Sequence, residues 1–183
     1  WCSGMKYIAL LRGVNVGGKS KVKMSELKLC FEGLGLEYVR TYINSGNVIF
    51  TSVKMDTITL AKEIELEIDI TFSFHVDVVV IDEYKYKNMI ESVPKGWGEK
   101  EGWKYNSLFL IPPYNIDEII ADMGELKPEI EAVVVGDGVI YQSMLFTSFG
   151  KTSSGKLASK ASYKKMTIRN WNTSKKLLEL LAS

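Results

Sequence analysis

The sequence predicts an α+β fold of two ferredoxin-like (βαββαβ) antiparallel-sheet subdomains in tandem, followed by a C-terminal helix. Three observations support it: strand-like and helix-like segments alternate in the order β-α-β-β-α-β, turn signals separate the paired strands, and the order recurs after residue 105. The composition, 46% hydrophobic and 25% charged over 183 residues, is that of an ordinary globular protein. Such a length suffices for one large or two small domains.

The first subdomain is expected over residues 5–92. Apolar residues recur at helical spacing from Met24 to Leu34, and Gly35 follows where a left-handed helix end is expected. The tight turn Asn-Ser-Gly separates two runs rich in β-branched and aromatic residues, which predicts a hairpin. The full expectation is a strand over 5–12, that first helix, a hairpin of 37–43 and 47–53, a second helix, a strand over 75–81 and a short helix ending before Pro94. The second helix is expected to be capped by Asp56 or Thr57 and to have Leu60, Ile64 and Ile68 on its inner side.

The second subdomain is expected over residues 106–183, after a glycine- and tryptophan-rich junction over 93–105. Its strands are recognised by β-branched runs and its helices by apolar spacing. The expected elements are a strand over 107–111, a helix over 115–123, a hairpin of 131–135 and 139–145, a helix over 155–163, a strand over 165–169 and a final helix capped by Asn172 or Thr173.

Several classes of protein are disfavoured by the composition. No apolar run approaches the roughly 18 residues of a membrane span. Residues 1–4 carry no signal-peptide pattern and resemble an added remnant, so we expect the native chain to start at Met5. Cys30 is then the only native cysteine, which leaves no disulfide framework and no zinc cluster. We therefore expect a cytoplasmic protein with no membrane partner, no metal and no cofactor.

Basic residues are unevenly placed although the formal net charge is only +1. Two stretches, 12–25 and 139–178, contain lysine and arginine but no acidic residue, whereas 117–137 is strongly acidic. Of the 23 basic residues only three are arginine, and two of these, Arg12 and Arg169, lie in the most distinctive polar motifs. Arginine suits the bidentate recognition of carboxylate or phosphate.

Residues 13–20, Gly-Val-Asn-Val-Gly-Gly-Lys-Ser, spell the phosphate loop of nucleotide triphosphatases. The run ending in Asp82 imitates the strand that carries a magnesium-linked aspartate. A true phosphate loop, however, joins a strand to a helix in a parallel sheet, whereas the hairpin around Asn44 predicts antiparallel pairing. Helical spacing also starts near Met24, so we expect Lys19 and Ser20 to lie in a loop.

Three separated segments, "ALLRGVNVGG", "TYINSGNVIF" and "MTIRNWNT", occur in this order along nearly the whole chain. Together they resemble the bacterial domain-of-unknown-function 1697 family. The resemblance implies a conserved bacterial protein with a two-subdomain α+β fold, and it implies no activity. In the family pattern the lysine after the glycine pair is optional, which makes the phosphate-loop spelling a coincidence.

The polar residues of these three motifs are the candidate ligand-binding residues, because free backbone amides, asparagine amides and arginine forks suit an anion. Asparagine, glycine and threonine also serve as turn and cap residues, so a purely structural role is the competing interpretation. The candidates are Arg12, Asn15, Gly17, Gly18, Lys19, Asn44, Ser45, Gly46, Asn47, Arg169, Asn170, Asn172 and Thr173. We expect Arg12, Asn47 and Arg169 to line one cleft.

The leading functional hypothesis is a binding protein for a phosphate-bearing ligand, either a nucleotide or a nucleic acid. One alternative is a magnesium-dependent phosphoryl-transfer enzyme that uses Lys19, Ser20 and Asp82. A further alternative is a protein–protein interaction module that uses an open sheet face or edge. No catalytic residue is assigned: the single histidine, His75, precedes a strand and is expected to be a strand-edge residue. Whether the protein is an enzyme stays open, as do its protein partners.

Overall fold

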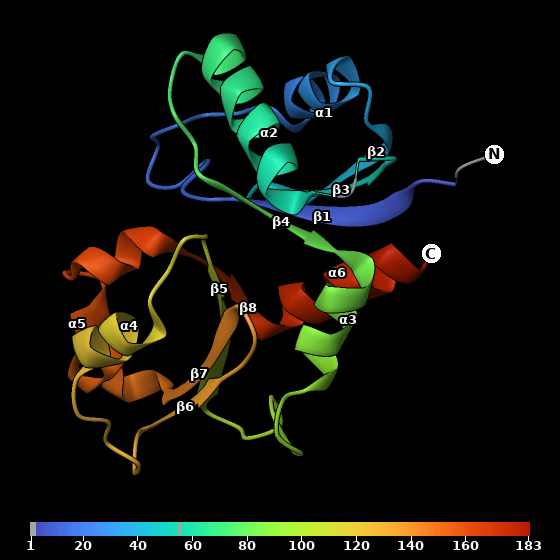
Figure 1. The fold of residues 1–183 in the computed structure, drawn as a ribbon. Helices are drawn as coiled ribbons and strands as arrows, with labels where there is room; N and C mark the ends of the chain where they lie inside the picture. The colour runs from blue at the N-terminus through green and yellow to red at the C-terminus, as the bar shows by residue number, and fades with distance from the viewer. Residues whose placement is uncertain (1–2, 55) are drawn as a thin grey trace. The chain divides into compact units, whose positions relative to one another are not determined.

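The computed structural model describes residues 3–54 and 56–183, so Trp1 and Cys2 of the expected remnant lie outside the described residues. The chain forms two compact units. The first comprises Trp1–Asn88 with Lys176–Ser183, and the second comprises Met89–Lys175. Each unit contains one four-stranded antiparallel sheet, which confirms the predicted α+β class with two tandem ferredoxin-like subdomains and a C-terminal helix (Figure 1).

The sheet of the first unit has the strand order β2-β3-β1-β4. The strand β1 lies between β3 and β4 and is antiparallel to both. Along the chain the elements are β1 (Met5–Leu11), α1 (Met24–Gly33), β2 (Glu37–Tyr42), β3 (Asn47–Ser52), α2 (Thr57–Phe72), β4 (Val78–Asp82) and α3 (Glu83–Glu91). The hairpin of β2 and β3 confirms the turn predicted from Asn-Ser-Gly.

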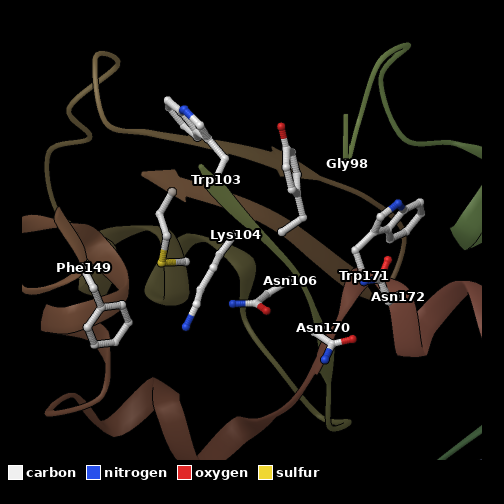
Figure 2. A pocket seen from close by; sticks show the side chains of 10 residues that line it. Gly98, Trp103, Lys104, Asn106, Phe149, Asn170, Trp171 and Asn172 are labelled. Atoms are coloured by element: carbon white, nitrogen blue, oxygen red, sulfur yellow. The ribbon is translucent and has the colours of Figure 1, made fainter. Parts of the chain in front are cut away.

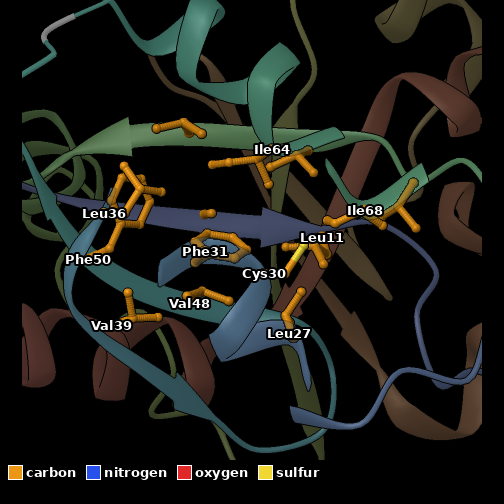
Figure 3. Packing of buried hydrophobic residues seen from close by; sticks show 14 of the residues in the cluster. Leu11, Leu27, Cys30, Phe31, Leu36, Val39, Val48, Phe50, Ile64 and Ile68 are labelled. Carbon is orange, nitrogen blue, oxygen red and sulfur yellow. The ribbon is translucent and has the colours of Figure 1, made fainter. Parts of the chain in front are cut away.

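The helices α1 and α2 pack on one face of the first sheet (Figures 1 and 3). Alternate residues of β1 face them, and Phe31 of α1 contacts Phe50 of β3 edge-on with ring centroids 5.6 Å apart. From α2, the predicted inner residues Leu60, Ile64 and Ile68 are all buried. The apolar residues that predicted each helix therefore form the face that packs on the core.

The sheet of the second unit repeats this order as β6-β7-β5-β8. The elements are β5 (Trp103–Leu110), α4 (Ile116–Met123), β6 (Glu131–Val135), β7 (Val139–Leu145), a 3₁₀ turn (Phe146–Lys151), α5 (Ser153–Leu157), a second 3₁₀ turn (Ala161–Lys165), β8 (Met166–Asn170) and α6 (Trp171–Ala182). A smaller apolar core lies between the sheet and the helices α4 and α5. It centres on Leu108, Ile119 and Leu157.

Three local expectations for the second unit need correction. The strand expected from residue 107 starts at Trp103, because residues 103–106 already pair with β7. The helix expected over 155–163 is interrupted after Leu157: the backbone and hydroxyl of Ser162 both donate to Asp122, which holds this segment in a 3₁₀ turn. The side chain that caps α6 is Asn170, whose oxygen accepts from Thr173 N at 2.7 Å.

The glycine- and tryptophan-rich segment, expected as a junction, packs within the second unit. Trp97 contacts Tyr105 and Tyr141 edge-on, with centroid separations of 5.1 and 6.1 Å. The division between the compact units falls earlier, between Asn88 and Met89. Within residues 3–54 and 56–183, no helix is both long and apolar enough to cross a bilayer.

Candidate functional site

The Gly-rich segment after β1 is a folded turn and does not open a helix. Lys19 N donates to Val16 O at 3.1 Å, and Asn15 N donates to Ser20 O at 3.1 Å. Gly17 and Gly18 have φ values of 58° and 75°, and a Cβ at either would meet nothing within 4 Å. Glycine therefore suits both positions because it readily adopts a positive φ. With no atoms close to either residue, the turn is open to solvent.

Asn15 braces this turn through its side chain. Its Nδ2 donates to Val22 O at 2.9 Å and to Asn44 O at 2.7 Å, and its Oδ1 accepts from Val22 N at 2.9 Å. Both amide hydrogens are thus used inside the protein. The predicted ligand residue Asn15 shapes the site by tying the Gly-rich segment to the hairpin turn at residues 43–46.

The hairpin turn is built against the end of β1. Asn47 is fully buried, and its Nδ2 donates to Tyr42 O at 3.1 Å and Ser45 Oγ at 2.9 Å. Gly46 has a φ of 77°, and a Cβ there would lie 2.7 Å from atoms of both Leu11 and Val14. Asn47 and Gly46 therefore hold the turn in place, whereas Asn44 is exposed at its tip.

A pocket of about 740 Å³ lies between these turns and the start of α1; we call it the first-unit pocket. Its charged lining residues are Lys21, Lys23 and Glu26, and the rest of its wall comes from Asn15, Gly18, Asn44 and the segment 22–25. No side chain caps α1, whose first helical backbone bond is Leu27 N to Lys23 O at 3.0 Å. The first turn of this helix, which no side chain caps, therefore lines a pocket that carries two lysines.

Two further predicted residues, Arg12 and Lys19, are close in the sequence to residues that line this pocket. Arg12 is half-buried and its backbone N donates to Asp77 O at 2.9 Å. Lys19 is exposed at the tip of the Gly-rich turn. Neither belongs to the described residues that line the first-unit pocket.

The strand expected over 75–81 starts at Val78, so His75 lies three residues before β4, where it pairs with Asp77. Its Nε2 is 2.9 Å from Asp77 Oδ1; the His75 side chain is exposed and that of Asp77 is partly exposed. The hydrogen bond and the charge of Asp77 raise the pKa of His75 above its ordinary value. The pair is therefore a local pH-sensitive contact.

The remaining predicted residues belong to the second unit. Arg169 is 7% exposed, and its Nη1 donates to Thr167 Oγ1 at 2.9 Å and Ile168 O at 3.0 Å. Asn170 caps α6, and Thr173 is buried at the start of that helix. The predicted residues thus divide between the two units, and a single cleft shared by Arg12, Asn47 and Arg169 stays a prediction.

A second pocket, of about 410 Å³, lies entirely within the second unit (Figure 2); we call it the second-unit pocket. Trp103, Tyr105, Phe149 and Trp171 give it aromatic walls, and Lys104, Asn106, Asn170 and Asn172 give it polar groups. Only Asn170 and Asn172 were expected at a site. The others could not be found from local patterns, because the pairing of β5 with β8 brings Asn106 opposite Asn170.

The geometry does not favour a nucleotide triphosphatase. The strand β1 is antiparallel to both neighbours, and α1 starts four positions after Ser20. Asp82 pairs with Tyr7, whereas the Gly-rich turn follows Leu11, which pairs with Val78. Asp82 therefore lies about 13 Å along the sheet from the start of that turn, at about 3.3 Å per residue. Its Oδ1 accepts from Lys85 N at 2.8 Å, as expected for a residue at a helix start.

Metal binding finds no support in the part of the chain that the structure describes. Among those residues, no group of three or more histidine, cysteine, aspartate or glutamate side chains is arranged to hold an ion. Cys30, the only cysteine in the described part, is buried in the first core. Burial raises the pKa of its thiol, so it is suited to packing and poorly suited to nucleophilic chemistry.

Comparisons with known proteins support the fold. Residues 5–141 match the family described as "Protein of unknown function (DUF1697)". The solved structure of the conserved bacterial protein SP0830 from Streptococcus pneumoniae is similar over 97% of this chain and 98% of that one, with 31% identity and a TM-score of 0.85. Protein BT0572 from Bacteroides thetaiotaomicron aligns over 93% of this chain and 95% of that one, but its 11% identity and TM-score of 0.24 carry no argument. No curated protein matches the sequence.

Proposed function

Because the chain belongs to the DUF1697 family of unknown function, we propose a function from its own geometry: the first unit binds a phosphate-bearing ligand in the first-unit pocket. The observation that carries the proposal is the start of α1, which no side chain caps and which lines this pocket together with Lys21 and Lys23. Unpaired amides and the helix dipole both favour a negative charge there.

Charge and rigidity in the same region support the proposal. Residues 12–25 contain no acidic side chain, so Glu26 is the only carboxylate among the described lining residues. Glu26 repels an anion, but the two lysines outweigh its single negative charge, so the net charge of the lining is positive. The braces made by Asn15 and Asn47 fix the turns on either side, which lowers the entropic cost of ordering the site around a ligand.

The ligand class is a phosphate group carried by a nucleotide or a nucleic acid. A nucleic acid would make several phosphate contacts, so its affinity would fall steeply as salt is raised. A mononucleotide would depend less on salt. A binding protein of this kind needs no metal and no cofactor, and a cytoplasmic location remains the expectation.

The test compares two double variants of equal charge by isothermal titration calorimetry at low salt. Lys21→Ala/Lys23→Ala removes the two lining lysines, whereas Lys28→Ala/Lys62→Ala removes two exposed helix lysines of the same unit outside the pocket. With pyrophosphate, AMP and a short single-stranded RNA as probes, we expect the first variant to bind about tenfold more weakly or worse. Equal affinity of the two variants, or no binding by the parent to any probe, would refute the proposal.

Magnesium-dependent phosphoryl transfer is the competing function. It would require Lys19 and Asp82 to act together, although they lie toward opposite ends of β1. It predicts hydrolysis of ATP that needs magnesium and disappears in Lys19→Ala. We expect the parent protein to show no such hydrolysis.

A further inference from the structure

One part of the second-unit pocket has a chemistry that the proposed phosphate site does not explain. Because side chains alternate along a strand, Lys104 and Asn106 of β5 lie on one face of the sheet, opposite to the aromatic side chains of that strand. Strand pairing places Met144 next to Lys104 and places Asn170 next to Asn106, so all four side chains share this face. These four residues and Phe149 line the pocket, and we call them the Lys104 cluster.

The polar side chains of the Lys104 cluster have hydrogen-bond donors to offer. Asn106 makes no side-chain hydrogen bond within the described residues, and Asn170 uses only its oxygen, which caps α6. Lys104 forms no ion pair with any described carboxylate, and its Nζ lies 4.5 Å from the ring centroid of Phe146. One ammonium group and two amide NH₂ groups are therefore present on one face of the sheet.

An exposed aromatic ring borders these donors. Phe149, in the 3₁₀ turn that follows β7, is 52% exposed. Figure 2 shows Phe149 on the same side of β5 as Lys104 and Asn106, whereas Trp103 lies on the other side. No carboxylate belongs to the described residues that line the pocket, so a cationic ligand is disfavoured. The cluster thus combines one positive charge, neutral donors and an aromatic surface.

We propose that the Lys104 cluster binds the carboxylate of an aromatic acid whose ring lies against Phe149. A carboxylate carries one negative charge, which the single lysine balances, and its oxygens can accept from both the ammonium and an asparagine amide. A phosphate monoester carries about two negative charges at neutral pH, which one lysine does not balance. Contact between rings favours an aromatic body over an aliphatic one. This inference does not depend on the phosphate site proposed for the first unit.

The test is an NMR titration of the ¹⁵N-labelled full chain with benzoate, because NMR locates the binding of a small and weakly bound acid. We expect saturable shifts at the amides of Lys104, Asn106 and Phe149. Acetate lacks the ring and benzamide lacks the charge, so each is expected to bind severalfold more weakly at these residues. Phenyl phosphate distinguishes the two kinds of anion and is expected to bind more weakly than benzoate.

Substitutions of exposed side chains assign the binding to the cluster. Lys104→Gln removes the charge and Phe149→Ala removes the ring, and both side chains are exposed, so the fold is expected to persist. We expect the affinity for benzoate to fall about tenfold in the first variant and severalfold in the second. Lys100→Gln is the matched control: Lys100 also lies over an aromatic ring, 4.0 Å from the centroid of Trp103, but does not line the pocket.

Four results would overturn the inference. The first is the absence of saturable shifts at the Lys104 cluster with benzoate. The second is equal affinity of Lys104→Gln and Lys100→Gln. The third is binding of acetate as tight as that of benzoate, and the fourth is tighter binding of phenyl phosphate at the same residues. Lys21→Ala/Lys23→Ala should leave the shifts at the cluster unchanged, so failure of the first-unit phosphate site can be told apart.

Discussion

The two units share one strand order but place their polar side chains differently. In the first unit, the core between the helices and the sheet is apolar, and the polar motif residues gather in the turns at one end of β1. In the second unit, polar side chains enter the buried layer itself. Glu131 is 2% exposed and its carboxylate accepts from Ser153 N at 2.6 Å, Ser153 Oγ at 2.8 Å and Lys127 N at 3.0 Å.

This difference follows from the helices that cover each sheet. The first sheet is covered by α1 and α2, of 10 and 16 residues, which supply continuous apolar faces. The second is covered by α4 and α5, of 8 and 5 residues, and by 3₁₀ turns. Such short segments leave backbone groups that need side-chain partners, and Glu131 and Asp122 supply them. One topology therefore supports two kinds of core and two different pockets.

The largest effect is expected from breaking the polar core of the second unit. Glu131→Ala would leave the buried amide and hydroxyl of Ser153 and the part-buried amide of Lys127 without this acceptor, so we expect a loss of about 3 kcal/mol or more in the free energy of unfolding. Urea denaturation measures it. The exposed Glu129→Ala is the control and should change the free energy little. Similar values for the two variants would mean that the buried carboxylate contributes nothing.

A smaller loss is expected from crowding the hairpin turn of the first unit. In Gly46→Ala the new Cβ would meet Leu11 and Val14 at 2.7 Å and would keep a strained φ of 77°, which should cost about 2–3 kcal/mol. Gly13→Ala has a similar φ of 72° but no atom within 4 Å, so it should cost only about 1 kcal/mol. Thermal or urea unfolding distinguishes them, and equal losses would show that close packing at Gly46 is unimportant.

The cap of α6 should contribute about 1 kcal/mol. Asn170→Ala removes the acceptor of Thr173 N and should destabilise the protein by this amount. Asn172→Ala removes a neighbouring exposed amide that makes no hydrogen bond within the described residues, and it should be close to neutral. If Asn172→Ala proved the more damaging change, the assignment of the cap would be wrong.

The smallest effect concerns pH. The pKa of His75 is raised in the folded protein, chiefly by its hydrogen bond to Asp77. The contact therefore stabilises the fold fully below the ordinary histidine pKa, near 6.5, and this contribution is lost as the pH rises through the folded value. Because His75 is the only histidine, its imidazole resonance can be titrated without ambiguity by NMR. We expect Asp77→Asn to lower its pKa, and an unchanged value would exclude the contact in solution.

The sequence predicted most of the fold because its signals were local. The spacing of Leu60, Ile64 and Ile68 predicted the buried face of α2, and Asn-Ser-Gly predicted the first hairpin. The end of the predicted 155–163 helix could not be seen locally, since it depends on hydrogen bonds between Ser162 and Asp122, 40 positions apart. Long-range partners of this kind leave no mark on the periodicity.

The candidate site was harder to predict for the same reason. The motif asparagines looked equally suitable as ligands and as braces, and only the contacts of Asn15 and Asn47 identify their bracing role. Asn106 and Trp103 carry no local signal, because they enter the second-unit pocket through strand pairing and the approach of Trp171. Charge was more informative: the acid-free stretch 12–25 supplies both lysines that line the first-unit pocket.

The most direct measurement of the central claim is an NMR titration of the ¹⁵N-labelled full chain with pyrophosphate, with sodium chloride at matched ionic strength as the reference. We expect saturable shifts at the backbone amides of Gly18, Ser25 and Glu26, which line the first-unit pocket, and small shifts elsewhere. Shifts equal to those in chloride, or shifts that leave the start of α1 unaffected, would contradict it.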